Sequence, residues 1–191
     1  MAPGGIPATG QVVDIVTGFV TGPDVKLYRS VRGRTGHPAV QGACKALSFV
    51  GEHGGVFLAT GLVGAAVDRG RRTQWLRATA TIAGAHAASM AVKRVVRRPR
   101  PNFPGLEPLV RTAGRHSFPS SHSVSAAASV VAFRGLVPGR VTVPAAVAMG
   151  FSRLVVGVHY PTDVIGGAAM GAAAAHLSRS WTRAGAAPKG A

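Results

Sequence analysis

The chain has 191 residues, and its 22 lysines and arginines against six acids give a formal net charge of +16. This length favours a single domain with its own core, and the single cysteine, Cys44, excludes an internal disulfide and a cysteine-based zinc site. Such a charge suits nucleic acid, but the basic residues fall in short clusters between long stretches rich in Ala, Val and Gly. That distribution is typical of loops between membrane helices, where basic residues face anionic headgroups or an anionic substrate.

The first 36 residues are predicted to form an interfacial segment ahead of the main domain. The N-terminus, MAPGGIPATG, lacks a basic region followed by an apolar core, so we expect no cleavable signal peptide. Residues 24–34 place one lysine and three arginines around Leu27 and Tyr28, which predicts an amphipathic segment lying on a membrane surface. A solvated tail is the alternative.

Five apolar stretches follow, each of roughly the 17–25 residues that a bilayer crossing needs. They run from about Ala43 to Val67, from Trp75 to Val92, from the Phe118-Pro-Ser cluster to about Val137, from Val141 to Val158, and from Thr162 to Leu177. Their many Ala and Gly residues permit close helix packing. The sequence therefore predicts an all-α fold: an integral membrane helical bundle of about five transmembrane helices over residues 37–178, followed by a disordered polar tail at 179–191.

The alternating direction of these helices brings four of their ends to one membrane face. The end of the second helix, the start of the third, the end of the fourth and the start of the fifth must meet there. Those junctions hold Lys93–Pro101, Pro119–His122, Ser152–His159 and Asp163. We therefore expect three polar segments to converge on one site.

Lys93–Pro101 is the first of these segments. Pro99 and Pro101 end the helix and fix Arg98 and Arg100 in a rigid, extended stretch. Guanidinium donors beside a lysine suit a phosphate dianion. A basic cluster that merely stops a membrane helix is the alternative for this segment taken alone.

Ser117–Ser123 is the second segment. A proline-led turn followed by Ser120 and Ser121 opens a helix, and its hydroxyls and free backbone N–H groups can bind an anion. His122 lies in the first turn, within reach of whatever those donors hold. An ordinary serine N-cap with an incidental histidine remains the alternative.

Ser152–Asp163 is the third segment, and it is the most concentrated. It places Arg153, His159 and Asp163 within eleven positions of otherwise apolar sequence. Asp163 can accept a hydrogen bond from the imidazole of His159, which fixes the tautomer and raises the basicity of the ring. A buried His–Asp pair without a catalytic task is the alternative, although ionisable groups inside a membrane protein are costly unless they have a function.

These three segments together resemble the type 2 phosphatidic acid phosphatase (PAP2) superfamily. Lys93–Pro101 fits its K-x6-R-P signature, Pro119–His122 is similar to its P-S-G-H signature, and Ser152–Asp163 fits S-R-x5-H-x3-D, in the right order. Ser121 departs from the pattern, because it stands where the family has glycine. Members of the superfamily include lipid phosphate phosphatases, enzymes that dephosphorylate decaprenyl-phosphoribose phosphate or undecaprenyl diphosphate, and vanadium haloperoxidases.

The resemblance implies a reaction without a metal or cofactor in which a histidine attacks phosphorus. His159 would be the nucleophile, Asp163 would orient and polarise it, and His122 would protonate the leaving oxygen and later activate water. Five groups would hold the phosphoryl oxygens during the reaction: Lys93, Arg100, Arg153, Ser120 and the backbone N–H of Ser121.

The resemblance also implies a substrate and a location. We expect hydrolysis of a lipid phosphate in a bacterial plasma membrane, with a polyprenyl-linked phosphate or diphosphate preferred and phosphatidic acid or another glycerolipid phosphate as the alternative. Expected partners are this lipid and anionic phospholipid headgroups, without nucleic acid; the oligomeric state stays open. Rival hypotheses are a non-catalytic membrane protein, a nucleic-acid-binding basic protein and, less favoured, a vanadate-dependent peroxidase.

Other polar residues yield weaker expectations. Glu52 and His53 begin the first span on the site face, where they either contact a headgroup or serve only the structure. Three arginines, Arg94, Arg97 and Arg98, are expected to face phospholipid headgroups more than the reacting phosphate. Basic loops opposite the site favour an extracytoplasmic site by the positive-inside rule, although the site face is equally basic.

Overall fold

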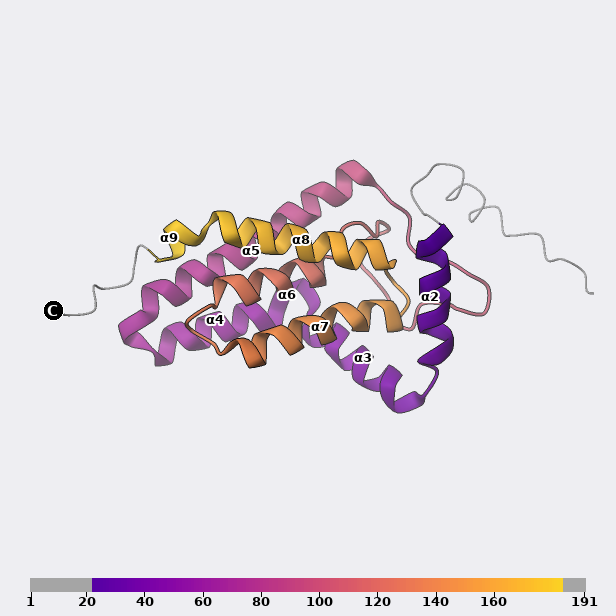
Figure 1. Ribbon diagram of the computed structural model, residues 1–191, viewed down its shortest axis with the longest axis horizontal. Coiled ribbons are helices and arrows are strands. Elements are labelled where there is room, and N and C mark those ends of the chain that lie inside the picture. The colour runs from indigo at the N-terminus through magenta and orange to yellow at the C-terminus, as the bar shows by residue number, and fades with distance from the viewer. Residues whose placement is uncertain (1–21, 184–191) are drawn as a thin grey trace, which may run out of the picture.

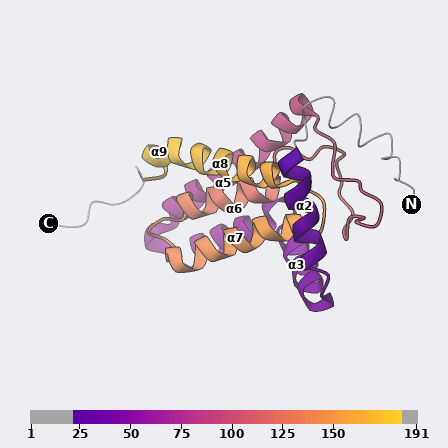
Figure 2. The same cartoon turned by 45° about the vertical axis from the view of Figure 1, so that its right-hand side comes forward.

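A computed structural model of the chain describes residues 22–183, which form helices and no β-strand. The body consists of α4 (Gly55–Val67), α5 (Arg72–Val96), α6 (Ser121–Ala132), α7 (Gly139–Val155) and α8 (Pro161–Leu177). These helices run roughly along the long axis, and α2 (Gly22–Arg34) lies across one end (Figure 1). The view turned by 45° shows the same crossing of α2 over the bundle end (Figure 2). The prediction of an all-α fold is confirmed.

Helix α6 lies in the middle of the bundle, where it packs against α5, α7 and α8. Its contact with α8 is closest at Gly171, where an added Cβ would lie 2.1 Å from the carbonyl oxygen of Val124. Gly167, one turn earlier on α8, meets the carbonyl of Ser120 in the same way. The small residues of α8 therefore set the distance between the helix that begins near His122 and the helix that carries Asp163.

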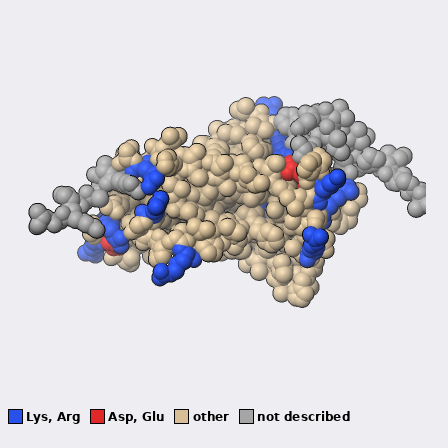
Figure 3. All heavy atoms as spheres, viewed as in Figure 1, with Lys and Arg blue, Asp and Glu red and all other residues tan. Residues whose placement is uncertain are grey.

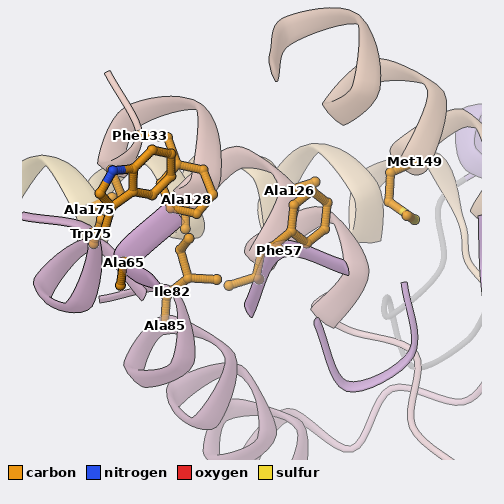
Figure 4. Packing of buried hydrophobic residues seen from close by; sticks show 13 residues of the cluster. Phe57, Ala65, Trp75, Ile82, Ala85, Ala126, Ala128, Phe133, Met149 and Ala175 are labelled. Carbon is orange, nitrogen blue, oxygen red and sulfur yellow. The ribbon is translucent and has the colours of Figure 1, made fainter. Parts of the chain in front are cut away.

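The apolar core lies between α4, α5 and α6, and it includes Met149 of α7 and Ala175 of α8 (Figure 4). Trp75 and Phe133 pack with ring centroids 5.4 Å apart, and Ile82 and Phe57 extend the cluster. The indole Nε1 of Trp75 also donates to Asp68, at 3.1 Å, in the turn that precedes α5. The core thus packs the body helices together along the length of the bundle.

The first predicted span is broken in two. It consists of α3 (Pro38–Val50), the 3₁₀ turn η1 (Glu52–Gly54) and α4, and the chain bends by 51° at the turn. His53 takes a left-handed conformation (φ 54°), which a straight helix cannot contain. Among residues 22–183, no single helix has the length and apolarity to cross a membrane, and only α3 and η1–α4 taken together could do so.

Two further boundaries differ from prediction. Helix α6 ends at Ala132, well before Val137, because the chain turns at Phe133–Val137 and begins α7 at Gly139. The predicted disordered tail starts too early, since Arg179–Arg183 form the short helix α9, which Arg77 contacts by donating to the carbonyl of Trp181. A second short turn, η2 (Arg69–Arg71), links α4 to α5. Residues 184–191 lie outside the described part of the chain.

Helix α2 is docked on the bundle by buried polar side chains. The Tyr28 hydroxyl donates to the carbonyl of Leu106 at 3.2 Å, and Arg32 Nη2 donates to the carbonyl of Glu107 at 2.8 Å. Tyr28 is fully buried. The predicted interfacial segment therefore packs one face against the main domain, while its first 21 residues lie outside the described part of the chain.

Candidate active site

The three predicted segments meet around one cavity of about 120 Å³. It lies where the C-terminal ends of α5 and α7 approach the N-terminal ends of α6 and α8, as the alternation of helices predicts. Six of the eight predicted site residues line it: Lys93, Arg100, Ser121, His122, Arg153 and His159. The other two, Ser120 and Asp163, lie behind this lining and are fully buried.

In the connection from α7 to α8, His159 lies between the carboxylate of Asp163 and the guanidinium group of Arg100. Its Nδ1 is 3.5 Å from Asp163 Oδ2, and its Nε2 is 3.4 Å from Arg100 Nη1. Because a guanidinium group can only donate, Nε2 must present its lone pair, and a neutral ring then carries its proton on Nδ1, toward Asp163. Burial lowers the pKa of His159 to about 3, against the opposing pull of Asp163, so the ring is neutral at physiological pH.

Asp163 is held in place by Arg98, which was expected to face lipid headgroups. Arg98 is buried; its Nη1 donates to Asp163 Oδ1 at 2.7 Å, and its Nη2 pairs with Asp24 of α2. The second carboxylate oxygen of Asp163 accepts from the backbone N–H of Tyr160 at 2.8 Å. The expectation for Arg98 was wrong: α5 ends at Val96, Arg97 takes a left-handed conformation, and the side chain of Arg98 then lies between two buried carboxylates.

Three cations surround the cavity. Lys93 Nζ donates to the carbonyls of His116, Ser117 and Pro119, which hold it against the turn before α6. Arg153 is 2% exposed, and its buried Nε has no partner among the described residues. Arg100 is tied to the carbonyls of Val158 and Gly114. Buried, fixed cations of this kind bind a phosphate dianion with little reorganisation.

The two serines differ in what they offer. Ser120 caps α6: its Oγ accepts from Ser123, and its backbone N–H donates to the carbonyl of Asp163 at 3.0 Å. Its hydroxyl is therefore outside the cavity lining. Ser121 does line the cavity, and its Oγ accepts a hydrogen bond from Ser89 of α5 at 2.9 Å. A contact with α5 thus accommodates the side chain that replaces the family's glycine.

His122 faces the cavity from the first turn of α6, and it shares a partner with Arg153. Its Nε2 is 3.2 Å from the carbonyl oxygen of Ser48, while the Ser48 hydroxyl accepts from Arg153 Nη1 at 2.6 Å. Because a carbonyl only accepts, Nε2 carries the proton in this arrangement. One residue of α3 therefore holds both the second histidine and an arginine that lines the cavity.

Sequence reasoning did not identify Ser48, Asp24 or Thr162 as parts of this site. Thr162 donates its backbone N–H to Asp24 at 3.0 Å, so a residue of α2 supports the turn that begins α8. The one available signal was that Asp24 is among only six acids in a strongly basic chain. Such scarce carboxylates are candidates for buried ion pairs.

Comparisons with known proteins identify the family of the chain. A model of the PAP2 superfamily matches residues 74–185. The chain is 41% identical over 149 residues to decaprenylphosphoryl-5-phosphoribose phosphatase of Mycolicibacterium smegmatis, covering 76% of this chain and 81% of that protein. A shorter match, 39% identical over 88 residues, is to lipid A 1-phosphatase of Rhizobium etli and covers 42% of this chain and 38% of that protein.

Two solved structures share the fold. The transmembrane PAP2 type phosphatidylglycerolphosphate phosphatase from Bacillus subtilis matches with a TM-score of 0.73 and 22% identity, over 88% of this chain and 90% of that chain. LpxE of Aquifex aeolicus matches with a TM-score of 0.71 and 20% identity, over 84% of this chain and 96% of that chain. At these identities the likeness is one of fold.

Proposed function

The chain belongs to the PAP2 superfamily and is a lipid phosphate phosphatase of that type, and on this premise we propose that it hydrolyses a polyprenyl-linked phosphate or diphosphate through a phosphohistidine intermediate, without a metal ion. The observation that carries the mechanism is the position of His159: its Nδ1 faces Asp163, and its Nε2 faces the cation-lined cavity. Because burial lowers the pKa of this ring, it is neutral at physiological pH and needs no prior deprotonation to act as a nucleophile.

In the first step, the Nε2 lone pair of His159 forms a bond to phosphorus, and the bond from phosphorus to the leaving oxygen breaks. Asp163 offsets the positive charge that the ring then carries. His122 acts as the general acid in its imidazolium form, which a bound phosphate dianion stabilises. It gives its Nε2 proton to the leaving oxygen and is left as a neutral ring with Nε2 unprotonated, and this requires the proton to turn from the Ser48 carbonyl toward the substrate.

In the second step, the now unprotonated His122 takes a proton from water, and the oxygen of that water attacks phosphorus. The bond from phosphorus to His159 breaks, which releases inorganic phosphate and restores the neutral ring. Throughout, Lys93, Arg100 and Arg153 hold the phosphoryl oxygens as charge moves onto them. These roles remain proposals for the residues that line the cavity.

The preference for a polyprenyl-linked substrate draws on similarity over most of the chain. The Mycolicibacterium smegmatis relative, whose name specifies a decaprenyl-linked phosphoribose, is matched over 81% of its length. The lipid A phosphatase match covers only 38% of its relative and supports the broader class of lipid phosphates. A glycerolipid phosphate such as phosphatidic acid is the alternative that a substrate panel separates.

We also propose that the chain is a multi-pass membrane protein with its cavity at the extracytoplasmic face. In Figure 3, lysines and arginines gather toward the two ends of the visible face and leave a broad uncharged surface between them. Large apolar side chains are exposed on several helices, with Val63, Val147 and Ile165 each at least 60% exposed. An apolar belt between charged ends suits a bilayer.

The test is phosphate release in detergent from a panel of polyprenyl and glycerolipid phosphates, with EDTA present. We expect wild-type protein to release phosphate and His159→Ala to lose essentially all activity. Vanadate, which mimics five-coordinate phosphorus, should inhibit. Activity of the alanine variant equal to wild type would sink the histidine mechanism, and loss of wild-type activity with EDTA would sink the metal-free one.

A further inference from the structure

We propose that the turn Gly51–Gly54 forms a subsite in which Glu52 and His53 bind the hydroxyl groups of a sugar-type alcohol, the group esterified to the reacting phosphate. The inference rests on the proposed function, and it specifies what lies between the phosphate and the lipid. It arises from the shape of the turn, from the charge of one side chain and from the polarity of the cavity wall.

Glycines at both ends of the turn press it against the catalytic helices. A Cβ on Gly51 would lie 2.5 Å from the Met149 side chain and 2.9 Å from the His122 ring, and one on Gly54 would lie 3.0 Å from Ser125 Oγ. The turn therefore cannot move away from His122 without opening this packing. It holds its two other residues, Glu52 and His53, in the lining of the same cavity.

His53 adopts a conformation that a histidine seldom takes. Its φ of 54° and ψ of 20° lie in the left-handed region, where the Cβ of a non-glycine residue comes too close to the backbone carbonyl oxygen. Its ring lies beside that of His86, with centroids 6.4 Å apart, and His86 Nδ1 is 3.0 Å from Ser125 Oγ. Strained conformations that the surrounding structure enforces cluster at ligand sites.

Glu52 is the only acid in a cavity lining that otherwise holds four cations. No hydrogen bond or ion pair of its carboxylate is recorded within residues 22–183. A carboxylate repels phosphate, so it does not serve the reacting group itself. An ionised carboxylate is an acceptor only, and hydroxyl groups are the neutral donors that it binds best.

The side chains of the lining bear on the choice of leaving group. Among the described residues, Met90 is the only large apolar one in the lining, so a hydrocarbon joined directly to the phosphate would have few apolar side chains to pack against. The second phosphate of a diphosphate would add negative charge beside Glu52. A neutral polyol between the phosphate and the lipid avoids both the poor packing and the charge repulsion. Its hydroxyl groups can donate hydrogen bonds to Glu52 and His53.

The experiment compares two substrates that differ only in hydroxyl groups: a prenyl-phosphoryl ribose 5-phosphate and its analogue without ring hydroxyls. Wild type should prefer the hydroxylated substrate, and Glu52→Gln should lower the ratio of the two kcat/KM values about 10-fold or more, since hydrogen bonds to a charged group are the strong ones. Glu107→Gln removes the same charge from a loop residue outside the cavity lining and should leave the ratio unchanged.

Each result decides the matter. An unchanged ratio in Glu52→Gln overturns the subsite. An equal fall for both substrates is one way to obtain it, because Glu52 would then act through its charge on Arg153 and not through the hydroxyl groups. If wild type releases phosphate from neither substrate nor from any lipid phosphate in the panel, the proposed function fails; release from both substrates without a preference refutes only the subsite.

Discussion

Arg98 joins two carboxylates that are 139 positions apart in the sequence, Asp24 and Asp163. All three side chains are at most 5% exposed. A planar guanidinium can serve two acids at once, whereas an ammonium group cannot reproduce both contacts. Arg98 therefore positions Asp163, which in turn faces Nδ1 of His159.

Replacing Arg98 with lysine keeps the charge and removes this fork. We expect kcat to fall about 100-fold, the size of effect seen when a reacting group is displaced by about 1 Å, with KM little changed. Arg97→Lys is the matched control, because Arg97 is exposed and its side chain bonds only the Arg94 carbonyl. Steady-state kinetics on one lipid phosphate check this, and equal activities of the two variants would contradict it.

The buried ring of His159 makes stability depend on pH. Its pKa is about 3 in the folded chain and 6.5 in the unfolded one, so between these values the unfolded state binds the extra proton. Stability is therefore present above pH 6.5 and is lost as pH falls toward 3. The Tm of wild type in detergent should fall from pH 7 to pH 5 more steeply than the Tm of His159→Asn. Parallel curves would contradict a neutral buried ring.

At the residue scale, the motif spacing predicted one site of eight residues, and six of these residues line one cavity. The motifs meet because each lies at the end of a helix, and the alternating direction of the helices brings those ends to the same side of the bundle. Arg98 and Ser48 could not be found in this way. A basic cluster at a helix end has the same sequence whether its side chains face solvent or turn inward. The packing of α2 brings Asp24 to Arg98, and the packing of α3 brings Ser48 to Arg153. Both contacts depend on the tertiary structure.

At the element scale, the contact between α6 and α8 sets the site. An added Cβ at Gly171 would lie 2.1 Å from the Val124 carbonyl oxygen, so Gly171→Ala must push the two helices apart. We expect a lower Tm and lower kcat, since His122 and Asp163 would separate. Gly84→Ala in α5 is the control: nothing lies within 4 Å of its Cβ, and alanine favours a helix by about 1 kcal/mol. Thermal unfolding and kinetics of both variants check this, and a Tm for Gly171→Ala at or above wild type would contradict it.

The apolar runs of the sequence predicted the positions of α5, α7 and α8, because each of these is one uninterrupted helix. The prediction of one helix over residues 43–67 was wrong, because the left-handed His53 divides this run into α3 and α4. Composition does not reveal such a break, since Glu52–Gly54 differs little from an ordinary polar start of a helix. The length of α6 was also overestimated, because an apolar turn follows its end at Ala132.

At the scale of the whole molecule, the cavity and the charged turn before α5 belong to opposite ends. Thr112 is exposed beside the cavity, and Thr73 is exposed next to the arginines of η2. The natural Cys44 is buried, so a new surface cysteine can be labelled selectively. We expect a membrane-impermeant thiol reagent to label Thr112→Cys on intact cells and Thr73→Cys only after permeabilisation. The reverse pattern would place the cavity in the cytoplasm.

Ser48 connects α3 to two candidate site residues, since its hydroxyl holds Arg153 and its carbonyl holds His122. In the proposed mechanism, a small displacement of α3 would therefore alter anion affinity and proton transfer together. For engineering, this means that Ser48 should stay fixed while libraries vary Glu52 and His53, just beyond it. If these two residues form the proposed subsite, selectivity would be redesigned from one short turn while His122 and Arg153 keep their positions.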